Sequence, residues 1–279
     1  MSYLKFVFSV PDHLHEHFIA ELLDMDFYGF EQLDNELIAY VEKRRFNDSN
    51  REHIEQLTAL FPDCSFREMD EIEEQNWNES WEKTIQPQTI GSFLVKPTWS
   101  DTQPEGGQIL LEIDPKMAFG TGYHATTRLA LRQLSSINCS GMKVMDAGTG
   151  TGILGIAAIK KGATQVVGFD TDPWSENNAV ENTYINGVQS QFAVRFGGIE
   201  QIEENEVFDL SLANINRNVI LEILEFLSKH TKPGGDIVIT GLLDTDEETI
   251  RGKIETLPVS VSEIAKEDEW ILFHLKRES

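Results

Sequence analysis

The feature that most constrains the fold is a glycine-rich run between a predicted strand and a predicted helix, "VMDAGTGTGILG", at residues 144–155. Gly148, Gly150 and Gly152 allow positive φ angles and leave no side chain between the backbone and a ligand. The helix that follows would present free N–H groups at the same place. The pattern predicts a strand–turn–helix unit whose turn binds a small molecule that contains a nucleoside.

Strand-like and helix-like segments alternate from Gly141 to the C-terminus. Such alternation predicts βαβ units in a mostly parallel sheet, with a ligand at the carboxyl ends of the strands. The second of these strands ends in Asp170, which is placed to bind ribose hydroxyls. The fourth ends in "LANI", which puts Asn214 at the edge where the ligand is expected, although such an Asn can also stabilise a turn. We expect a final antiparallel strand, "WILFHLKR", to complete the sheet.

The first third of the chain has a different pattern, with the predicted order β-α-β-β-α-β of a ferredoxin-like fold. "YLKFVFSV" alternates like a strand, Pro11 and Asp12 open a helix, and Asp34-Asn35 is a turn between two further strands. A second helix stops at Pro62, and "CSFREMDEI" suits a last strand. The helix residues expected to be buried are apolar: Leu14, Phe18, Ile19, Leu22, Leu23, Ile54, Leu57 and Leu60.

A connector follows, in which Trp77 and Trp81 are four residues apart on one face of a predicted helix, so they are expected to pack rather than to bind a ligand. Residues 96–108 are predicted to form a turn-rich loop. We therefore divide the chain into an N-terminal domain at residues 1–66, a linker helix at 67–88 and a larger α/β domain at 89–279.

The formal net charge is −24, from 23 Lys and Arg against 47 Asp and Glu. This charge disfavours nucleic acid and anionic membranes and favours a basic partner, although acidic surfaces also serve solubility alone. Residues 1–85 carry 7 basic and 20 acidic side chains, more than half of the net charge. The two cysteines, Cys64 and Cys139, give neither a disulfide framework nor a metal-ligand spacing, so we expect a cytoplasmic protein without metal. No apolar run approaches the length of a membrane span and no signal peptide is expected.

The run from Gly150 to Gly155 also satisfies G-x-G-x-x-G, so a dinucleotide must be considered. Asp146 argues against it, because its carboxylate would lie near a bound diphosphate and repel it, whereas S-adenosylmethionine offers an amino group and a sulfonium there. No Gly-Lys-Ser/Thr occurs, which excludes a P-loop. S-adenosylmethionine is favoured. An NAD-dependent oxidoreductase and a binding module without activity are the alternatives.

A second glycine-containing stretch, "DPKMAFGTGYHATTRLAL", precedes the first one at residues 114–131. Residues 141–275 resemble the class I S-adenosylmethionine-dependent methyltransferases, with a Rossmann-like fold. Together with "LDNELIAYVE" and the tryptophan connector, the second stretch extends the resemblance over nearly the whole chain. The chain resembles the bacterial methyltransferase family that trimethylates amines of large-subunit ribosomal protein eleven.

The resemblance implies a small N-terminal substrate-recognition domain, a linker and a class I catalytic domain. It implies that Thr127, Gly148, Asp170 and Asn214 bind the cofactor, and to these we add Asp146, Gly150 and Gly152 from the loop itself. Thr127 can also be the N-cap of a helix. The stretch "AFGTGYHATT" would line the mouth of the cofactor and substrate site. The mouth residues are Phe119, Gly120, Thr121, Gly122 and His124, the last with no assigned step.

The implied activity is that of a protein N-methyltransferase of enzyme class 2.1.1, with lysine side chains or an N-terminal α-amine of that ribosomal protein as acceptors. Asn214 is the expected catalytic residue, because a neutral amide can orient an amine without holding it as ammonium. The chain has Tyr123 and Ala125 where the family usually has Thr and Pro, and Asn216-Arg217 where apolar residues are common. These departures leave another protein or a small molecule as alternative acceptors. We expect a monomer that binds neither nucleic acid nor membranes.

Overall fold

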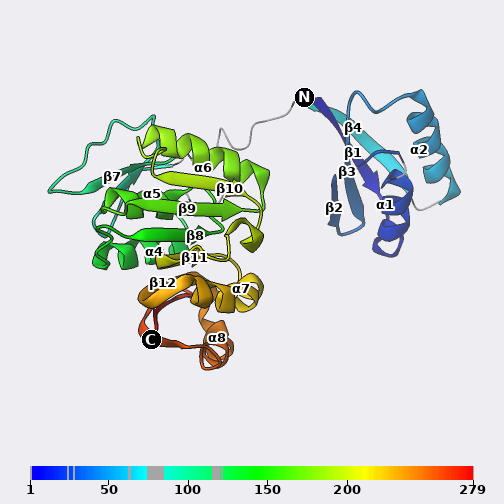
Figure 1. Cartoon of the computed structure of the whole chain (residues 1–279). Coiled ribbons are helices and arrows are strands. Elements are labelled where there is room, and N and C mark those ends of the chain that lie inside the picture. The colour runs from blue at the N-terminus through cyan, green and yellow to red at the C-terminus, as the bar shows by residue number, and fades with distance from the viewer. Residues whose placement is uncertain are drawn as a thin grey trace. The chain divides into compact units, whose positions relative to one another are not determined.

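The structure is a computed structural model that describes residues 2–23, 25–27, 29–61, 64–73, 85–114, 120 and 122–278. The chain divides into two compact units, Met1–Trp77 and Asn78–Ser279 (Figure 1). Each unit has its own hydrophobic core, so each is described separately.

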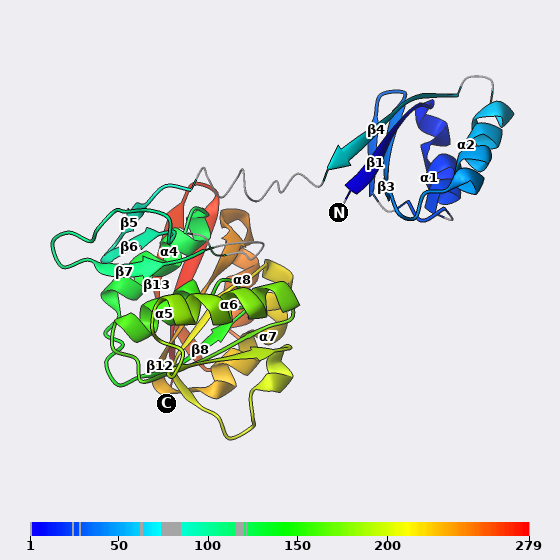
Figure 2. The same cartoon turned by 90° about the horizontal axis from the view of Figure 1, so that it is seen from above.

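The N-terminal unit is one four-stranded antiparallel sheet with both of its α-helices on one face (Figure 2). The strands lie in the order β2-β3-β1-β4, which is the predicted ferredoxin-like arrangement. Its elements are β1 (Ser2–Ser9), a 3-10 turn (Asp12–Leu14), α1 (His15–Leu23), β2 (Gly29–Leu33), β3 (Glu36–Glu42), α2 (Asp48–Leu60) and β4 (Ser65–Glu73).

Local sequence explains the turns of this unit. Asn35 has a φ of 53°, the left-handed region that Asn tolerates, and it closes the predicted turn between β2 and β3. Asn47 and Asn50 form a reciprocal capping box at the start of α2. The unit's core holds Phe18, Leu22, Ile54 and Leu57 from the helices, as predicted.

Three predictions for this unit are wrong. Leu23 and Leu60 are 53% and 73% exposed, because each is the last residue of its helix, past the part that packs on the sheet. Residues 67–73 belong to β4 and not to a linker helix, because their backbone pairs with β1 as far as Glu73. The rest of the predicted linker, with Trp77 and Trp81, lies mostly outside the described residues.

The second unit is built on a seven-stranded sheet in the order β10-β9-β8-β11-β12-β14-β13. The five strands β8 to β12 are parallel to one another, and β14 is antiparallel to both of its neighbours, as the sequence predicts. The strands are β8 (Lys143–Ala147), β9 (Gln165–Asp170), β10 (Phe192–Phe196), β11 (Phe208–Asn214), β12 (Thr231–Leu243), β13 (Val259–Glu267) and β14 (Trp270–Arg277).

Helices cover both faces of this sheet. Neighbouring residues of β8 point to opposite faces, so Val144 belongs to the core under α4 and α5, and Met145 to the core under α7 and α8. The helices are α4 (Ala125–Ser136), α5 (Ile153–Lys160), α6 (Pro173–Ile185), α7 (Arg217–His230) and α8 (Glu247–Ile254). None of the helices in the described ranges is both long and apolar enough to span a bilayer.

A three-stranded sheet of β5 (Gln88–Ile90), β6 (Phe93–Lys96) and β7 (Ile109–Glu112) packs on the α4 and α5 side. These strands are not predicted from the sequence, because three or four residues are too few to show a period. Strand β8 is the first strand of the α/β sheet, and β9 and β11 lie on either side of it. The order reverses at that point, so a ligand is expected at the carboxyl ends of β8 and β11.

Candidate active site

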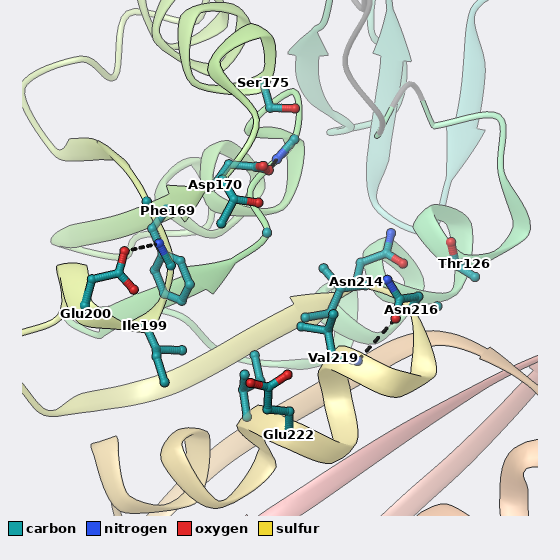
Figure 3. A pocket seen from close by; sticks show the side chains of 18 of the residues that line it. Thr126, Phe169, Asp170, Ser175, Ile199, Glu200, Asn214, Asn216, Val219 and Glu222 are labelled. Carbon is teal, nitrogen blue, oxygen red and sulfur yellow. Dashed lines mark hydrogen bonds between the residues drawn. The ribbon is translucent and has the colours of Figure 1, made fainter. Parts of the chain in front are cut away.

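A cavity of about 660 Å³ lies at the carboxyl ends of β8, β9, β11 and β12 (Figure 3). Its volume is within the range of small-molecule sites. Four residues that the sequence assigns to the cofactor line it: Gly148, Gly150, Asp170 and Asn214.

The glycine turn after β8 is held close to the next segments of the chain. The N–H groups of Gly148 and Thr149 both donate to the carbonyl oxygen of Phe169, at 2.9 and 3.1 Å. Gly148 has a φ of 69°, and a Cβ atom there would overlap the side chain of Ile215, which also lines the cavity. Glycine is therefore required at this position by both the backbone angle and the close approach.

Asp170 ends β9 at the rim of the cavity. Its Oδ2 accepts a hydrogen bond from the N–H of Gly150 at 2.9 Å, and its Oδ1 accepts one from the N–H of Asp172 at 3.0 Å. Each carboxylate oxygen has a further lone pair. Asp170 can therefore stabilise the glycine turn and still accept hydrogen bonds from ligand hydroxyls.

Asp146 does not line the cavity. It shares the face of β8 with Val144 and is only 1% exposed. Its Oδ2 accepts hydrogen bonds from the Thr149 hydroxyl at 2.8 Å and from the N–H of Gly155 at 3.1 Å. Burial raises the pKa of Asp146 to about 7, although these two hydrogen bonds act to lower it. The carboxyl group therefore buttresses the turn from beneath, and this placement weakens the sequence argument that its charge excludes a diphosphate.

Thr127 and Gly152 also lie behind the cavity wall. Thr127 is the third residue of α4 and is fully buried, and His124 is the N-cap of that helix, so the N-cap interpretation of Thr127 is wrong. Its neighbour Thr126 lines the cavity instead. Gly152 caps α5 with a φ of 81° and packs against Ala179.

Asn214 ends β11 in the middle of the cavity wall (Figure 3). Its Nδ2 donates to the hydroxyl of Thr127 at 3.3 Å. Its Oδ1 is buried and accepts no hydrogen bond from any residue that the structure describes. A buried acceptor without a donor costs about 1–3 kcal/mol. The Asn214 oxygen is thus an acceptor to which a ligand N–H group can donate.

Asn216 and Arg217, two of the four departures from the family pattern, differ in their placement. Asn216 is the N-cap of α7, where its Oδ1 accepts from the N–H of Val219 at 3.2 Å, and it lines the cavity (Figure 3). Arg217 is half-exposed, binds Asp246 at 3.0 Å and does not line the cavity. Of the two, only Asn216 is in a position to meet a ligand.

His124 and Trp270 form another part of the wall. Their rings meet edge to face, with centroids 4.6 Å apart, and Nδ1 of His124 is 2.8 Å from the Thr126 hydroxyl. Burial lowers the pKa of His124, and the charge of Arg128 lowers it further, whereas Glu269 opposes both. The imidazole is therefore held in its neutral form near pH 7.

The described part of the mouth stretch is close to the glycine turn. The carbonyl oxygen of Gly120 accepts a hydrogen bond from the Thr151 hydroxyl at 2.7 Å. Gly122 packs on Val95 and is not part of the cavity wall. Phe119 and Thr121 lie outside the described residues.

Three buried asparagines spaced four residues apart connect these segments: Asn178 and Asn182 on α6, and Asn186 at its C-cap. Asn182 Oδ1 accepts from the N–H of Asp114 at 3.0 Å, and its Nδ2 donates to the Thr151 carbonyl at 2.9 Å. Asn186 bonds to both backbone groups of one residue: its Oδ1 accepts from the N–H of Glu112, and its Nδ2 donates to the carbonyl oxygen of Glu112. These amides, which we call the asparagine ladder, hold the start of the mouth stretch beside the glycine turn.

Several residues of the cavity wall are not among those predicted from the sequence. The apolar ones lie near the carboxyl ends of parallel strands, on the helix that follows β11 or at the start of β14: Phe169, Ile199, Val219, Ile223 and Trp270. Phe169 lies within the predicted strand "QVVGFD", and Ile199 and Val219 could have been found by extending the search a few residues beyond a predicted strand. Trp270 begins an antiparallel strand, so its position depends on the fold of the β13–β14 hairpin.

Comparison with known proteins gives a consistent result. The sequence model of the family described as ribosomal protein L11 methyltransferase (PrmA) matches residues 14–278. Proteins named ribosomal protein L11 methyltransferase from Chlorobaculum parvum and Phocaeicola vulgatus are 34% and 31% identical to this chain. Both alignments cover 97% of it, and they cover 95% and 97% of those proteins.

A crystal structure described as a ribosomal protein L11 methylase from Lactobacillus delbrueckii subsp. bulgaricus superposes with a TM-score of 0.65 at 27% identity. The match covers 70% of this chain and all of that one. The family match spans both compact units and includes the glycine turn, Asp170 and Asn214. The chain belongs to the PrmA family of ribosomal protein L11 methyltransferases.

Proposed function

We propose that this protein transfers methyl groups from S-adenosylmethionine to amines of ribosomal protein L11, on lysine side chains, the N-terminal α-amine or both. Membership of the family supports the reaction and the acceptor. The observation that carries the chemistry is the buried Oδ1 of Asn214, an acceptor with no donor among the described residues, in the wall of a cavity large enough for a nucleoside.

The residues present fit S-adenosylmethionine. Asp170 has free acceptor capacity for ribose hydroxyls, and Gly148 and Gly150 offer backbone without side chains beside it. Ile199, Val219 and Ile223 give an apolar surface for a base. Asp146, Gly152 and Thr127 act indirectly in this proposal, because they hold the glycine turn and Asn214 in place.

When bound, the cofactor supplies an electrophilic methyl group, and the proposal includes no metal because a sulfonium needs none to react. The contribution of the chain is to hold a neutral amine in line. Asn214 accepts an N–H hydrogen bond and so points the nitrogen lone pair at the methyl group. A carboxylate at this place would favour the ammonium form, which cannot attack. The hydrogen bond from the Asn214 amide to the Thr127 hydroxyl fixes the amide, so the Asn214 oxygen is pre-oriented.

The acidic N-terminal unit is the proposed recognition site for the basic acceptor protein. The boundary moves from residue 66 to Trp77, because β4 continues to Glu73. A fragment that starts at Asn78 is expected to bind cofactor and to lose methylation of the protein acceptor. Full activity of this fragment would contradict the proposed docking role. We place the protein in the cytoplasm, as a monomer that binds neither nucleic acid nor membranes.

The direct test is to incubate isolated large-subunit ribosomal proteins with the enzyme and isotope-labelled S-adenosylmethionine, and to identify the labelled protein by mass spectrometry. Methyl groups on L11 amines are expected. Label confined to another protein would overturn the acceptor assignment. Binding of NAD but not of S-adenosylhomocysteine in calorimetry would overturn the cofactor assignment. This control is needed because Asp146 is buried beneath the turn, where its charge does not exclude a diphosphate.

A further inference from the structure

We propose that Arg128 is a positioning residue that clamps the β13–β14 turn onto the start of α4, and so holds His124 against Trp270 in the cavity wall. The kinetic effect that we expect rests on the proposed methyl transfer, whereas the clamp itself rests on geometry alone.

The contacts of Arg128 join segments about 140 residues apart in the chain. Its Nε and Nη2 are both 2.6 Å from Oε1 of Glu267, the last residue of β13. Its Nη1 donates to the carbonyl oxygen of Tyr123, the residue before His124. One guanidinium therefore ties the backbone at the mouth to the hairpin, which only a planar fork of donors can do with this geometry.

Glu267 is held from a second side. Its Oε2 is 2.5 Å from Nη1 of Arg132, one helical turn further along α4. Burial alone would raise the pKa of Glu267, but the hydrogen bonds and charges of Arg128 and Arg132 outweigh burial and lower it. The Arg128 and Glu267 side chains are only 22% and 18% exposed, so solvent screens this pair less than it screens a surface pair.

The clamp acts on the ring pair because of its short connections. Trp270 is separated from Glu267 by the two-residue turn Asp268-Glu269, in which Asp268 has a φ of 51°. His124 directly follows Tyr123, whose carbonyl oxygen Arg128 binds. Fixing Glu267 and Tyr123 to one guanidinium therefore fixes the two rings that meet at 4.6 Å.

The wall that the clamp holds faces the acceptor rather than the nucleoside. Thr126, which contacts His124, lies on the Asn214 side of the cavity, across from Asp170 (Figure 3). Loosening the clamp should therefore raise the KM for the acceptor protein and lower kcat, while the Kd of the cofactor product S-adenosylhomocysteine stays unchanged.

The test compares Arg128→Gln with Arg132→Gln. Arg132 binds the same carboxylate but is 50% exposed and has no contact with Tyr123 in the described residues, so it is a matched control. We expect Arg128→Gln to lower kcat/KM for the acceptor between about 10- and 100-fold. Arg132→Gln should lower it by less than about fivefold. Arg128→Lys keeps the charge without the fork and should lie between them.

A second readout does not depend on turnover. Loss of the Arg128 charge should raise the pKa of His124, because a neighbouring cation disfavours the imidazolium. Nuclear magnetic resonance titration, with His124→Asn to assign the signal, measures it. Equal losses in the two variants, an unmoved His124 titration or a parallel loss of S-adenosylhomocysteine binding would overturn the clamp. Absence of methylation by the unaltered protein would overturn the function instead.

Discussion

The two ends of the cavity are built in different ways. At the glycine turn, the polar side chains are satisfied within the protein: Asp170 by Gly150 and Asp172, and Asp146 by Thr149 and Gly155. At the end of β11, the oxygen of Asn214 has no donor among the described residues. The first end is complete without a ligand, whereas the second is completed only by one. Under the proposed function, the first end is a preformed cofactor site and the second is a reactive site that depends on its acceptor.

The largest effect should follow from Asn214→Ala. The variant should lose about 100-fold or more in kcat, because the amine is no longer aligned, while the Kd of S-adenosylhomocysteine changes little. Single-turnover kinetics and calorimetry measure the two quantities. Asn214→Asp offers a matched control, since it keeps the shape but favours ammonium, and its rate should rise more steeply with pH. A loss of cofactor affinity without a loss of turnover would reverse the roles of the two ends.

Gly148→Ala tests the cradle. The new side chain would meet Ile215 in a left-handed backbone region, so cofactor affinity should fall about 10-fold or more while folding is retained. Gly187→Ala is the matched control, because Gly187 has the same φ of 69° but no atom within 4 Å of the added Cβ. That variant should lose only about 1–2 kcal/mol of stability and no affinity. Equal affinities in the two variants would show that close approach at Gly148 is unimportant.

Asp146→Asn tests the buttress beneath the turn. Both hydrogen bonds go to Oδ2, so an amide oxygen can accept them in its place. The folded-state pKa of Asp146 is raised to about 7 from 3.8, and the native carboxyl therefore costs stability as pH rises from about 4 to 7. The amide has no such cost, so the variant should gain on the order of 4 kcal/mol relative to the native chain at pH 8, because each pK unit of the shift is worth about 1.4 kcal/mol, and nothing near pH 4. Urea unfolding at both pH values measures it, and a gain independent of pH would contradict the assignment.

The smallest effect is expected from Arg217→Gln. Arg217 is half-exposed and lies outside the cavity, and its buried partner Asp246 keeps the hydrogen bond from the N–H of Leu243, so stability should change by only about 1 kcal/mol. Acceptor KM should be unchanged, in contrast to Asn216→Ala, which removes a wall residue. A large rise in KM for Arg217→Gln would show that the acceptor site extends beyond the cavity.

The fold and the centre of the site were within reach of the sequence. Alternating strands and helices predicted the parallel sheet, and the position of Asn214 followed from the rule that ligands lie at strand ends. The exact depth of Asp146 and Thr127 was not predictable in this way, because it depends on which face of β8 and which turn of α4 each residue takes. The His124–Trp270 contact joins segments far apart in the chain, and no local pattern reports such a contact.

The asparagine ladder has a consequence beyond the site. Strand β7 is an edge strand of its small sheet. The unpaired N–H and C=O groups of an edge strand can pair with a strand of another chain. Asn186 binds the N–H and C=O groups of Glu112, the last residue of β7, as a neighbouring strand would, and Asn182 accepts from the N–H of Asp114 just beyond the strand. The C-terminal end of α6 thereby covers the end of an edge strand that would otherwise be open to strand addition. A variant that lacks both amides is expected to aggregate through β7.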